Sequence, residues 1–234
     1  MLQRWMKFMV VFAAASVLST SCKKEYSKDE PLPEEFKPSL FISSQNEFLY
    51  ALDPKTGDKI WEYYIGTNVQ ATPVIIGDYL FLPTEDSLIK MDAKRGTVVK
   101  KYNLMPQHNM FGFLSSPTTG PGGMLYIGSV NDTLYALDAN NDQIKWKVGL
   151  GADIMSSPIL VGTQLIVAAA NTVHSLNTTD GSTNWTFTGG AFRSSPAVSG
   201  DNVFIGSDNG NMYSLNLRTG VQNWAYATGG FIES

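Results

Sequence analysis

The side chains in this sequence that could do chemistry are few and scattered. Met105, His108 and Met110 lie close together, and thioether and imidazole groups suit a soft metal ion such as copper. Two methionines and a histidine in an apolar stretch more often pack against a neighbouring element, and we favour that interpretation. The single cysteine, Cys22, excludes an intramolecular disulfide and a metal site built of cysteines. From the residues we therefore predict no catalytic residue, no bound metal and no cofactor.

Residues 1–21 have the pattern of an export signal. Arg4 and Lys7 precede the apolar run FMVVFAAASVL, and the small residues STS stand just before Cys22. This run is well short of the roughly 20 apolar residues that a membrane-spanning helix needs. We predict that residues 1–21 direct export and do not belong to the fold.

Cys22 stands where it could carry a lipid. Its position, four residues after Leu18, resembles the lipobox of bacterial lipoproteins, with Ser19 where leucine is usual. The resemblance implies acylation of the thiol and a place in the cell envelope as an outer-membrane lipoprotein, facing the periplasm or the surface. The alternative is a secreted protein with an unpaired thiol, which an oxidising compartment disfavours.

Residues 22–38 read as a lipidated flexible tether. They are polar, charged and rich in proline, so they bury too little apolar surface to fold alone. The whole chain has 17 basic and 21 acidic residues, a formal net charge of −4. Such a balance argues against nucleic acid as a partner, because phosphates require clustered Lys and Arg.

A short motif recurs five times along the remaining chain. Its copies begin with an acid or its amide, 39, 46, 39 and 39 residues apart: Asp53, Asp92, Asp138, Asn177 and Asn216. The eighth residue after each is usually tryptophan: Trp61, Lys100, Trp146, Trp185 and Trp224. A second column repeats a proline after Ser or Thr: Pro73, Pro117, Pro158 and Pro196. Repeats at this period indicate an array of similar units.

The motif has a local physical meaning. A period-two strand ends at Asp53, whose carboxylate accepts backbone N–H groups of the following turn. Gly57 takes the positive φ that the turn requires, and Trp61 fills the gap between neighbouring sheets. Four short strands per unit predict an all-β fold, a β-propeller of four-stranded antiparallel blades.

The stretch ALDPKTGDKIW, residues 51–61, resembles the docking motif of the PQQ-dehydrogenase-like, or quinoprotein-like, propellers. Asp138 and Trp146 match in another unit, and Trp185 and Trp224 match in part. Lys100 departs from the pattern, so we expect the joint beside it to be less well packed. The resemblance covers about residues 39–234. It implies a propeller, and, in the enzymes of the family, oxidation of alcohols or sugars with PQQ and calcium through acidic residues. We interpret the repeated aspartates as turn residues instead.

The repeats predict four complete blades and one partial blade in residues 39–234. The first unit lacks its opening strand, and residues 229–234 stop before another Ser-Pro strand. We expect an incomplete ring of seven or eight blades, truncated at the C-terminus. Open blade faces would favour self-association.

One column varies within this regular frame. Three residues before the strand-opening prolines stand Gln70, Leu114, Met155 and Arg193, with Glu233 in the equivalent place; of these, Gln70, Met155, Arg193 and Glu233 are the candidates for binding a partner. These positions lie in loops at one face of a propeller, where partner recognition is commonly built. The alternative is that they are solvated loop residues free to vary.

Three functions follow from these observations. We favour a non-catalytic, lipid-anchored propeller that binds other envelope proteins; anchor and repeat together resemble the propeller lipoproteins of the outer-membrane β-barrel assembly machinery. The second is a fragment of a dehydrogenase that uses PQQ and calcium. The third is an envelope propeller that binds carbohydrate or another ligand, with Phe111 and Phe113 as stacking residues.

Overall fold

The computed structural model describes residues 38–67, 69–104 and 112–233. The predictions for residues 1–21, Cys22 and all but the last residue of the tether 22–38 lie outside these residues. So do those for Met105, His108, Met110 and Phe111. In the described ranges, no helix is both long and apolar enough to pass through a bilayer.

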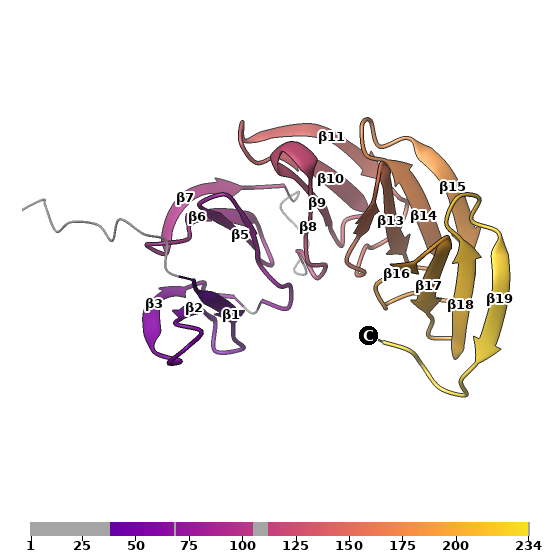
Figure 1. The fold of residues 1–234 in the computed structure, drawn as a ribbon, viewed down its shortest axis with the longest axis horizontal. Helices are drawn as coiled ribbons and strands as arrows, with labels where there is room; N and C mark the ends of the chain where they lie inside the picture. The colour runs from indigo at the N-terminus through magenta and orange to yellow at the C-terminus, as the bar shows by residue number, and fades with distance from the viewer. Residues whose placement is uncertain (1–37, 68, 105–111, 234) are drawn as a thin grey trace, which may run out of the picture. The chain divides into compact units, whose positions relative to one another are not determined.

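The described residues form five antiparallel sheets, each a meander of strands consecutive in sequence (Figure 1). The first has three strands: β1 (Leu40–Ser43), β2 (Phe48–Leu52) and β3 (Lys59–Tyr64). The second has four: β4 (Val74–Ile76), β5 (Tyr79–Pro83), β6 (Leu88–Asp92) and β7 (Thr97–Tyr102). The third has β8 (Thr118–Gly120), β9 (Met124–Gly128), β10 (Thr133–Asp138) and β11 (Gln143–Gly149), with the 3-10 turn Pro121–Gly123 after β8.

The last two sheets repeat the same plan. The fourth has β12 (Ile159–Val161), β13 (Gln164–Ala169), β14 (Thr172–Asn177) and β15 (Thr183–Thr188). The fifth has β16 (Ala197–Ser199), β17 (Asn202–Gly206), β18 (Asn211–Asn216) and β19 (Gln222–Ala227). The predicted all-β fold of four complete blades and one partial blade is confirmed.

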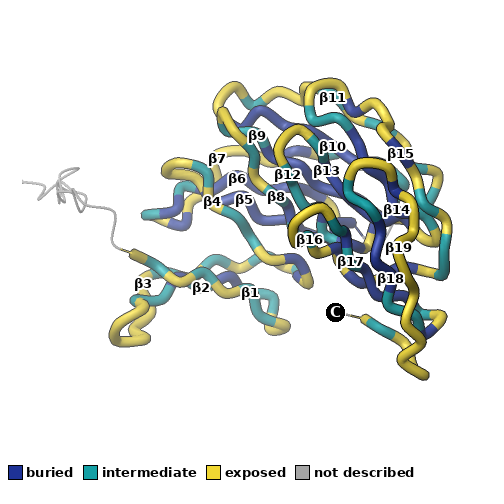
Figure 2. The backbone as a smooth tube through the Cα atoms, turned by 45° about the vertical axis from the view of Figure 1, so that its right-hand side comes forward, coloured by how far each residue is buried: buried dark blue, intermediate teal, exposed yellow. Residues whose placement is uncertain are grey.

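The apolar core lies between consecutive sheets. The two middle strands of each four-stranded blade are the most buried, whereas β7, β11 and β19 are largely exposed (Figure 2). One cluster, for example, joins Ile166 and Val173 of the fourth sheet to Val203 and Leu215 of the fifth. Because both faces of the middle strands are covered, most of their consecutive residues are buried, as in β6 and β10.

A β-bulge recurs at the same place in every sheet. Between the third and fourth strands, or the second and third in the first sheet, the register shifts one residue before the repeated Asp or Asn. In the first sheet Ala51 pairs with Trp61 but Leu52 pairs with Lys59, so Ile60 is the extra residue. A bulge bends a strand and changes the direction of its side chains, and here it lies beside the repeated turn of each sheet.

Hydroxyl groups connect the innermost strands of successive blades. The backbone N–H of Thr72 donates to Ser116 Oγ at 2.8 Å, that of Ser116 to Ser157 Oγ at 2.9 Å, and that of Ser157 to Ser195 Oγ at 2.9 Å. Each of these residues immediately precedes the column proline. The Ser/Thr-Pro column therefore supplies one hydrogen bond per blade to the contact between blades.

Candidate functional site

The repeated acids cap the turns that hold the frame. Asp53 Oδ1 accepts from the backbone N–H groups of Lys55 and Thr56, at 2.8 and 3.3 Å. Asp138 Oδ1 accepts likewise from Asn140 and Asn141. A further side-chain hydrogen bond from Asn141 is the largest cause that lowers the pKa of Asp138 to about 2. These contacts occupy the carboxylates in turn geometry.

Three tryptophans each dock on the turn of the next sheet. The indole Nε1 of Trp61 donates to the carbonyl of Ala93 at 3.1 Å, that of Trp146 to Thr178 at 2.9 Å, and that of Trp185 to Leu217 at 2.9 Å. Every acceptor directly follows the repeated Asp or Asn. We call each such contact a Trp joint. Trp224 is the exception, since its side chain is 45% exposed.

A glycine in each receiving turn makes room for the indole. Gly96, Gly181 and Gly220 have positive φ, and a Cβ atom at these positions would lie 2.6, 2.8 and 2.5 Å from the ring of Trp61, Trp146 and Trp185, respectively. Both the backbone conformation and the close approach require glycine. Gly57 has the same conformation, with φ of +76°, but no atom of the described residues lies within 4 Å of its Cβ position.

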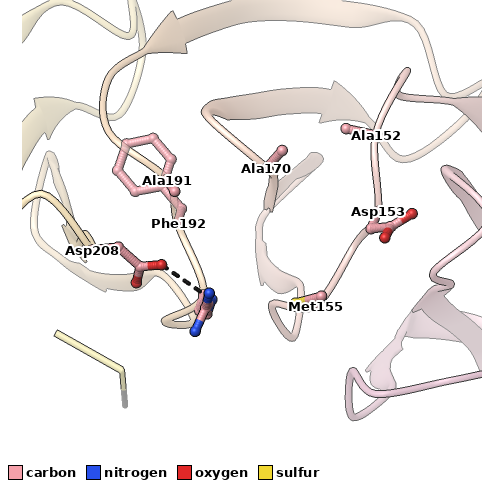
Figure 3. A pocket seen from close by; sticks show the side chains of 8 residues that line it. Ala152, Asp153, Met155, Ala170, Ala191, Phe192 and Asp208 are labelled. Carbon is pink, nitrogen blue, oxygen red and sulfur yellow. Dashed lines mark ion pairs between the residues drawn. The ribbon is translucent and has the colours of Figure 1, made fainter. Parts of the chain in front are cut away.

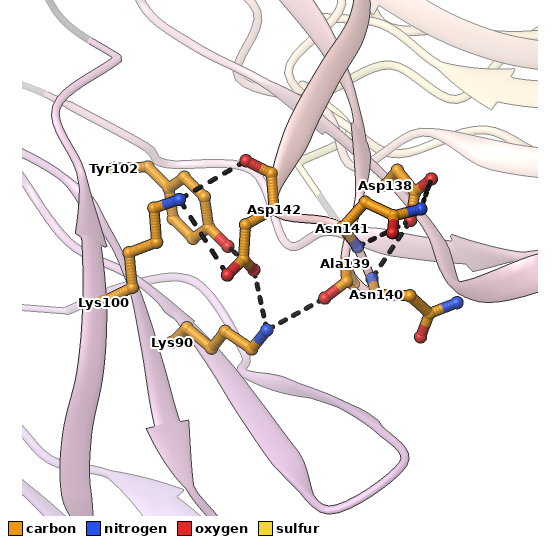
Figure 4. Close-up of polar contacts among 8 residues, drawn as sticks. All are labelled: Lys90, Lys100, Tyr102, Asp138, Ala139, Asn140, Asn141 and Asp142. Carbon is orange, nitrogen blue, oxygen red and sulfur yellow. Dashed lines mark hydrogen bonds and ion pairs between the residues drawn. The ribbon is translucent and has the colours of Figure 1, made fainter.

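The joint between the second and third sheets is built differently. Lys100 stands in the tryptophan column, and Asp142 stands where the other turns have glycine. Lys90 is 4% exposed and donates to the carbonyl of Ala139 at 2.9 Å and to Asp142 Oδ1 at 2.7 Å. The Tyr102 hydroxyl also donates to Asp142 Oδ1 (Figure 4). We call this contact the Lys–Asp joint.

Charge and burial shift the pKa values in the Lys–Asp joint. Burial opposes ionisation of Asp142, but hydrogen bonds from Lys90 and Tyr102 and the charges of Lys90 and Lys100 outweigh it, so the pKa of Asp142 lies below its ordinary value. Burial, with the hydrogen bond to Asp142, raises the pKa of Tyr102. Lys90 also lies over the Tyr79 ring, 4.3 Å from its centroid. At neutral pH the joint thus holds an ionised carboxylate between cations and a neutral phenol.

Two residues of the variable column meet in one pocket. Met155 and Arg193 both line a surface pocket of about 440 Å³ (Figure 3). Its other lining residues are Ala152, Asp153, Ala170, Ala191, Phe192 and Asp208. The loop that precedes β12 forms one wall and the loop that precedes β16 the other. The hairpins after β13 and β17 contribute Ala170 and Asp208.

The charged rim of this pocket is organised around Arg193. Its Nε lies 3.1 Å from Asp208 Oδ2 and its Nη1 lies 3.2 Å from Glu233 Oε1. Glu233, another residue of the variable column, is therefore joined to Arg193 without lining the pocket. Gln70 is exposed and lies in the loop before β4, outside the pocket. The second oxygen of Asp208 is buried and has no hydrogen-bond partner among the described residues.

Sequence reasoning missed the residues that complete the pocket. Ala170 and Asp208 belong to hairpins, 15 residues from Met155 and from Arg193 along the chain. A signal was present beside the variable column, because each candidate follows an apolar residue that is buried, as Val69, Ile154 and Phe192 are, or partly buried, as Ile232 is. An apolar plug followed by an exposed variable residue is typical of a loop held firmly against its sheet.

One stacking candidate is corrected by the structure. Phe113 is buried in the core between the second and third sheets and meets the edge of Tyr135, with ring centroids 6.5 Å apart. A buried ring has no face to offer a sugar, so the proposed stacking role of Phe113 is wrong. Apolar side chains of two sheets surround Phe113, and the hydrophobic effect favours its burial among them.

The described residues also offer no cluster of ligands for the calcium of the resembled dehydrogenases. Within these residues, no three His, Cys, Asp or Glu side chains gather as metal ligands would. Asp92, like Asp53 and Asp138, accepts backbone N–H groups of its own turn.

A protein-family comparison matches most of the chain. The model described as outer membrane protein assembly factor BamB matches residues 27–110 and 101–231. The chain belongs to the BamB family. The predicted resemblance to PQQ-dehydrogenase-like propellers is thereby confirmed, with similarity to BamB within that group.

Curated relatives of the BamB family and of the dehydrogenases share modest identity with the chain. The outer membrane protein assembly factor BamB of Yersinia pestis is 26% identical over 149 residues, which are 57% of this chain and 38% of the relative. The quinohemoprotein alcohol dehydrogenase ADH-IIG of Pseudomonas putida is 25% identical over 142 residues, 57% of this chain and 19% of that enzyme. The chain thus spans well under half the length of both.

A solved structure supports the fold. BamB from Moraxella catarrhalis superposes with a TM-score of 0.71 at 22% identity, over 81% of this chain and 61% of that one. The likeness agrees with the propeller blades described above.

Proposed function

We propose that this chain is a non-catalytic scaffold of the bacterial cell envelope that binds another envelope protein at the pocket of Met155 and Arg193. The observation that carries the proposal is the meeting of these two variable-column residues in one pocket on an otherwise regular frame. The names of its BamB relatives, which describe outer membrane protein assembly, support a protein partner of this kind.

The chemistry of the pocket suits a peptide segment with one apolar anchor. Three alanines and Phe192 supply apolar walls, and Met155 adds a flexible thioether that adapts to different shapes. Arg193 is 59% exposed despite its two acidic partners, so it can turn toward an acidic or carbonyl group of a bound segment. An anchor buried among apolar side chains with an arginine beside it is a common arrangement of binding hot spots.

The same proposal includes how the chain reaches its partner. Residues 1–21 serve as a lipoprotein signal, Cys22 carries the lipid, and residues 22–38 form the tether that leaves the propeller free at the outer membrane. Mass spectrometry of the mature N-terminus tests this part: a diacylated or triacylated Cys22 supports it, and a cleaved but unmodified Cys22 contradicts it.

Site-specific cross-linking in cells tests the partner face. The lipidated full chain carries Met155→p-benzoylphenylalanine, and irradiation should join it to a distinct envelope protein. Arg193→Glu in the same chain should reduce that product about tenfold, because a charge at the centre of a contact is reversed.

Arg218→Glu is the matched control. Arg218 is an exposed arginine in the turn between β18 and β19, at the opposite end of the fifth sheet from Arg193. The charge change is identical, so the cross-link should persist. Equal losses in both variants, or an unchanged yield in Arg193→Glu, would contradict the proposed face.

A further inference from the structure

His174 stands in a column that the other sheets fill mainly with tyrosine. The residues three before the repeated Asp or Asn are Tyr50, Ile89, Tyr135, His174 and Tyr213. His174 is 9% exposed, and its Nε2 atom is buried with no hydrogen-bond partner among the described residues. A buried polar atom without a partner is costly, and imidazole is the side chain that gains a charge just below neutral pH. Packing alone therefore does not account for a histidine here.

The hairpin of the fourth sheet explains why the imidazole lacks a partner. In the fifth sheet the Tyr213 hydroxyl accepts a hydrogen bond at 2.7 Å from Asn209, four residues earlier. Four residues before His174 stands Ala170, whose side chain has no polar atom. Only two residues separate β13 from β14, whereas four separate β17 from β18. This short hairpin also supplies Ala170 to the pocket of Met155 and Arg193 (Figure 3).

His174 faces the third sheet and the loop before β12. It pairs with Val167 of β13, and residues paired across two strands share one face of the sheet. Val167 belongs to the apolar cluster between the third and fourth sheets, and so does Ile154. Ile154 lies in residues 150–158, which we call the β12 loop. This loop forms one wall of the pocket through Ala152, Asp153 and Met155.

The neighbouring repeats show which contact this column makes. The residues four before three of the strand-opening prolines are Phe113, Ile154 and Phe192. Phe113 meets the edge of Tyr135 and Phe192 that of Tyr213, with ring centroids 6.5 and 5.8 Å apart. The repeat thus places Ile154 beside His174. The backbone N–H of Ile154 donates to the Ser129 carbonyl at 3.1 Å and so ties the β12 loop to the third sheet.

In the described part of the chain, no charge offsets the burial of His174. Burial is the cause that lowers the pKa of His174 below its ordinary value of 6.5. Strands β12 to β15 contain no Asp, Glu, Lys or Arg, and Lys147 pairs with Tyr135 on the face toward the second sheet. The other ionisable residues of the third sheet's strands, the turn before β10 and the β12 loop do not contribute to the shift: Tyr126, Asp132, Asp138, Lys145 and Asp153. Protonation would therefore leave an uncompensated charge against apolar side chains.

We propose that His174 makes the β12 loop acid-sensitive: protonation of the imidazole releases this loop from the fourth sheet, and with it one wall of the pocket. The released state binds more protons, because its imidazole is solvated. The contact is thus complete above about pH 6.5 and weakens as pH falls below that value. Its consequence for partner binding rests on the proposed function, whereas the acid sensitivity of the loop does not.

Amide hydrogen exchange of the full chain at pH 7.5 and 5.5 tests the release. After correction for the intrinsic pH dependence of exchange, the protection of the Ile154 N–H should fall at least about threefold at pH 5.5, because release takes up a proton. The Phe113 N–H is the matched control. It donates to the Thr84 carbonyl at 3.1 Å, at the same repeat position, beside a tyrosine. Its protection should not change.

Replacing the imidazole should remove the pH effect. In His174→Phe and in His174→Gln, the protection of the Ile154 N–H should be equal at the two pH values. His108, the other histidine of the sequence, is present in all three proteins, so its titration cannot produce the difference. The proposal is overturned by an unchanged Ile154 in the wild type, by an equal fall at Ile154 and Phe113, or by a fall that persists in both variants.

The cross-link from Met155→p-benzoylphenylalanine separates this proposal from the function on which its last step rests. In envelopes resuspended at pH 5.5, the yield should be lower than at pH 7.5, and adding His174→Phe should make the two yields equal. A yield that is equal at both pH values with His174 in place overturns the control of binding. A cross-link absent at both pH values contradicts the proposed partner face, while exchange at Ile154 still decides the acid sensitivity of the loop.

Discussion

The Trp joints and the Lys–Asp joint solve the same problem with different chemistry. In a Trp joint an indole lies on glycine and donates its N–H to the backbone carbonyl that follows the repeated Asp or Asn. In the Lys–Asp joint that carbonyl, Ala139, accepts instead from the Lys90 ammonium group. The backbone carbonyl of the turn is therefore the hydrogen-bond acceptor in both kinds of joint, whereas the donor is an indole in one and an ammonium group in the other.

Three positions differ together between the two kinds of joint. Lys90 pairs with Lys100 across the bulged strands. In the other four sheets a tryptophan stands in place of Lys100, and the residue paired with it is alanine or serine. Asp142 replaces the glycine and keeps a positive φ of 56°. A small residue, an indole and a glycine are thus replaced by a cation, a cation and an acid. The two joint types should respond differently to substitution and to pH.

The largest effect is expected from filling the glycine of a Trp joint. Gly220→Ala should lower the free energy of unfolding by about 3 kcal/mol, because it combines a strained left-handed backbone with a clash against Trp185. Gly57→Ala is the control with a similar φ but an open Cβ position, and should cost about 1 kcal/mol. Urea denaturation followed by tryptophan fluorescence measures both. Equal costs would show that the indole does not depend on the glycine.

Removing the buried cation Lys90 should lower the free energy of unfolding somewhat less than Gly220→Ala does. Lys90→Ala removes the donor of the Ala139 carbonyl and the buried cation beside Asp142, and we expect a cost of about 2 to 3 kcal/mol, reduced because Asp142 is partly exposed. Lys100→Ala should cost under about 1 kcal/mol, because Lys100 is half-exposed and its Nζ lies 3.9 Å from Asp142 Oδ2. If Lys100→Ala costs as much as Lys90→Ala, the assigned donor is wrong.

Converting one joint into the other sharpens the comparison. The triple variant Lys90→Ala, Lys100→Trp, Asp142→Gly carries the residue types of a Trp joint at all three positions. It should be about 2 kcal/mol more stable than the sum of the three single changes predicts, since residues in one contact are coupled. The double variant that retains Asp142 serves as the control, because its new indole meets the aspartate side chain. Additive effects would mean that these positions do not act together.

The smallest expected effect is a pH dependence confined to the Lys–Asp joint. The pKa of Asp142 is lower in the folded chain than in the unfolded chain, so its stabilising contribution is complete above the ordinary aspartate value and is lost as pH falls through the folded value. The stability difference between wild type and Asp142→Asn should therefore shrink as pH is lowered from about 5 toward 2. A difference that stays constant over that range would contradict the ionised state of Asp142.

Much of the frame was predictable because the repeat exposes it. The Asp53, Gly57 and Trp61 pattern implies a capped turn and an interblade indole, and five copies imply five sheets. The Lys–Asp joint was harder, since Lys90 and Asp142 lie 52 residues apart and only the packing of two sheets brings them together. Its signal was the simultaneous departure of Lys100 and Asp142 from two columns that the other units share.

The candidate site, too, was predictable only in part. The variable column pointed to Met155 and Arg193, because variation within a regular frame is visible in the sequence. The pocket between them was not, since its shape depends on how two hairpins, at Ala170 and Asp208, lie against two loops. Phe113 shows the opposite error: an aromatic residue in a loop segment was taken for a surface group, but two sheets bury it.

Indole hydrogen exchange tests the central claim, that tryptophans of consecutive sheets are held by the turns they dock on. In dilute nitrogen-15-labelled protein, the Nε1–H groups of Trp61, Trp146 and Trp185 should exchange slowly, because each donates to a carbonyl of the next sheet. The Nε1–H of Trp224 should exchange rapidly. Fast exchange at all four tryptophans would contradict the docking of indoles on glycine turns, and with it the frame that carries the proposed binding face.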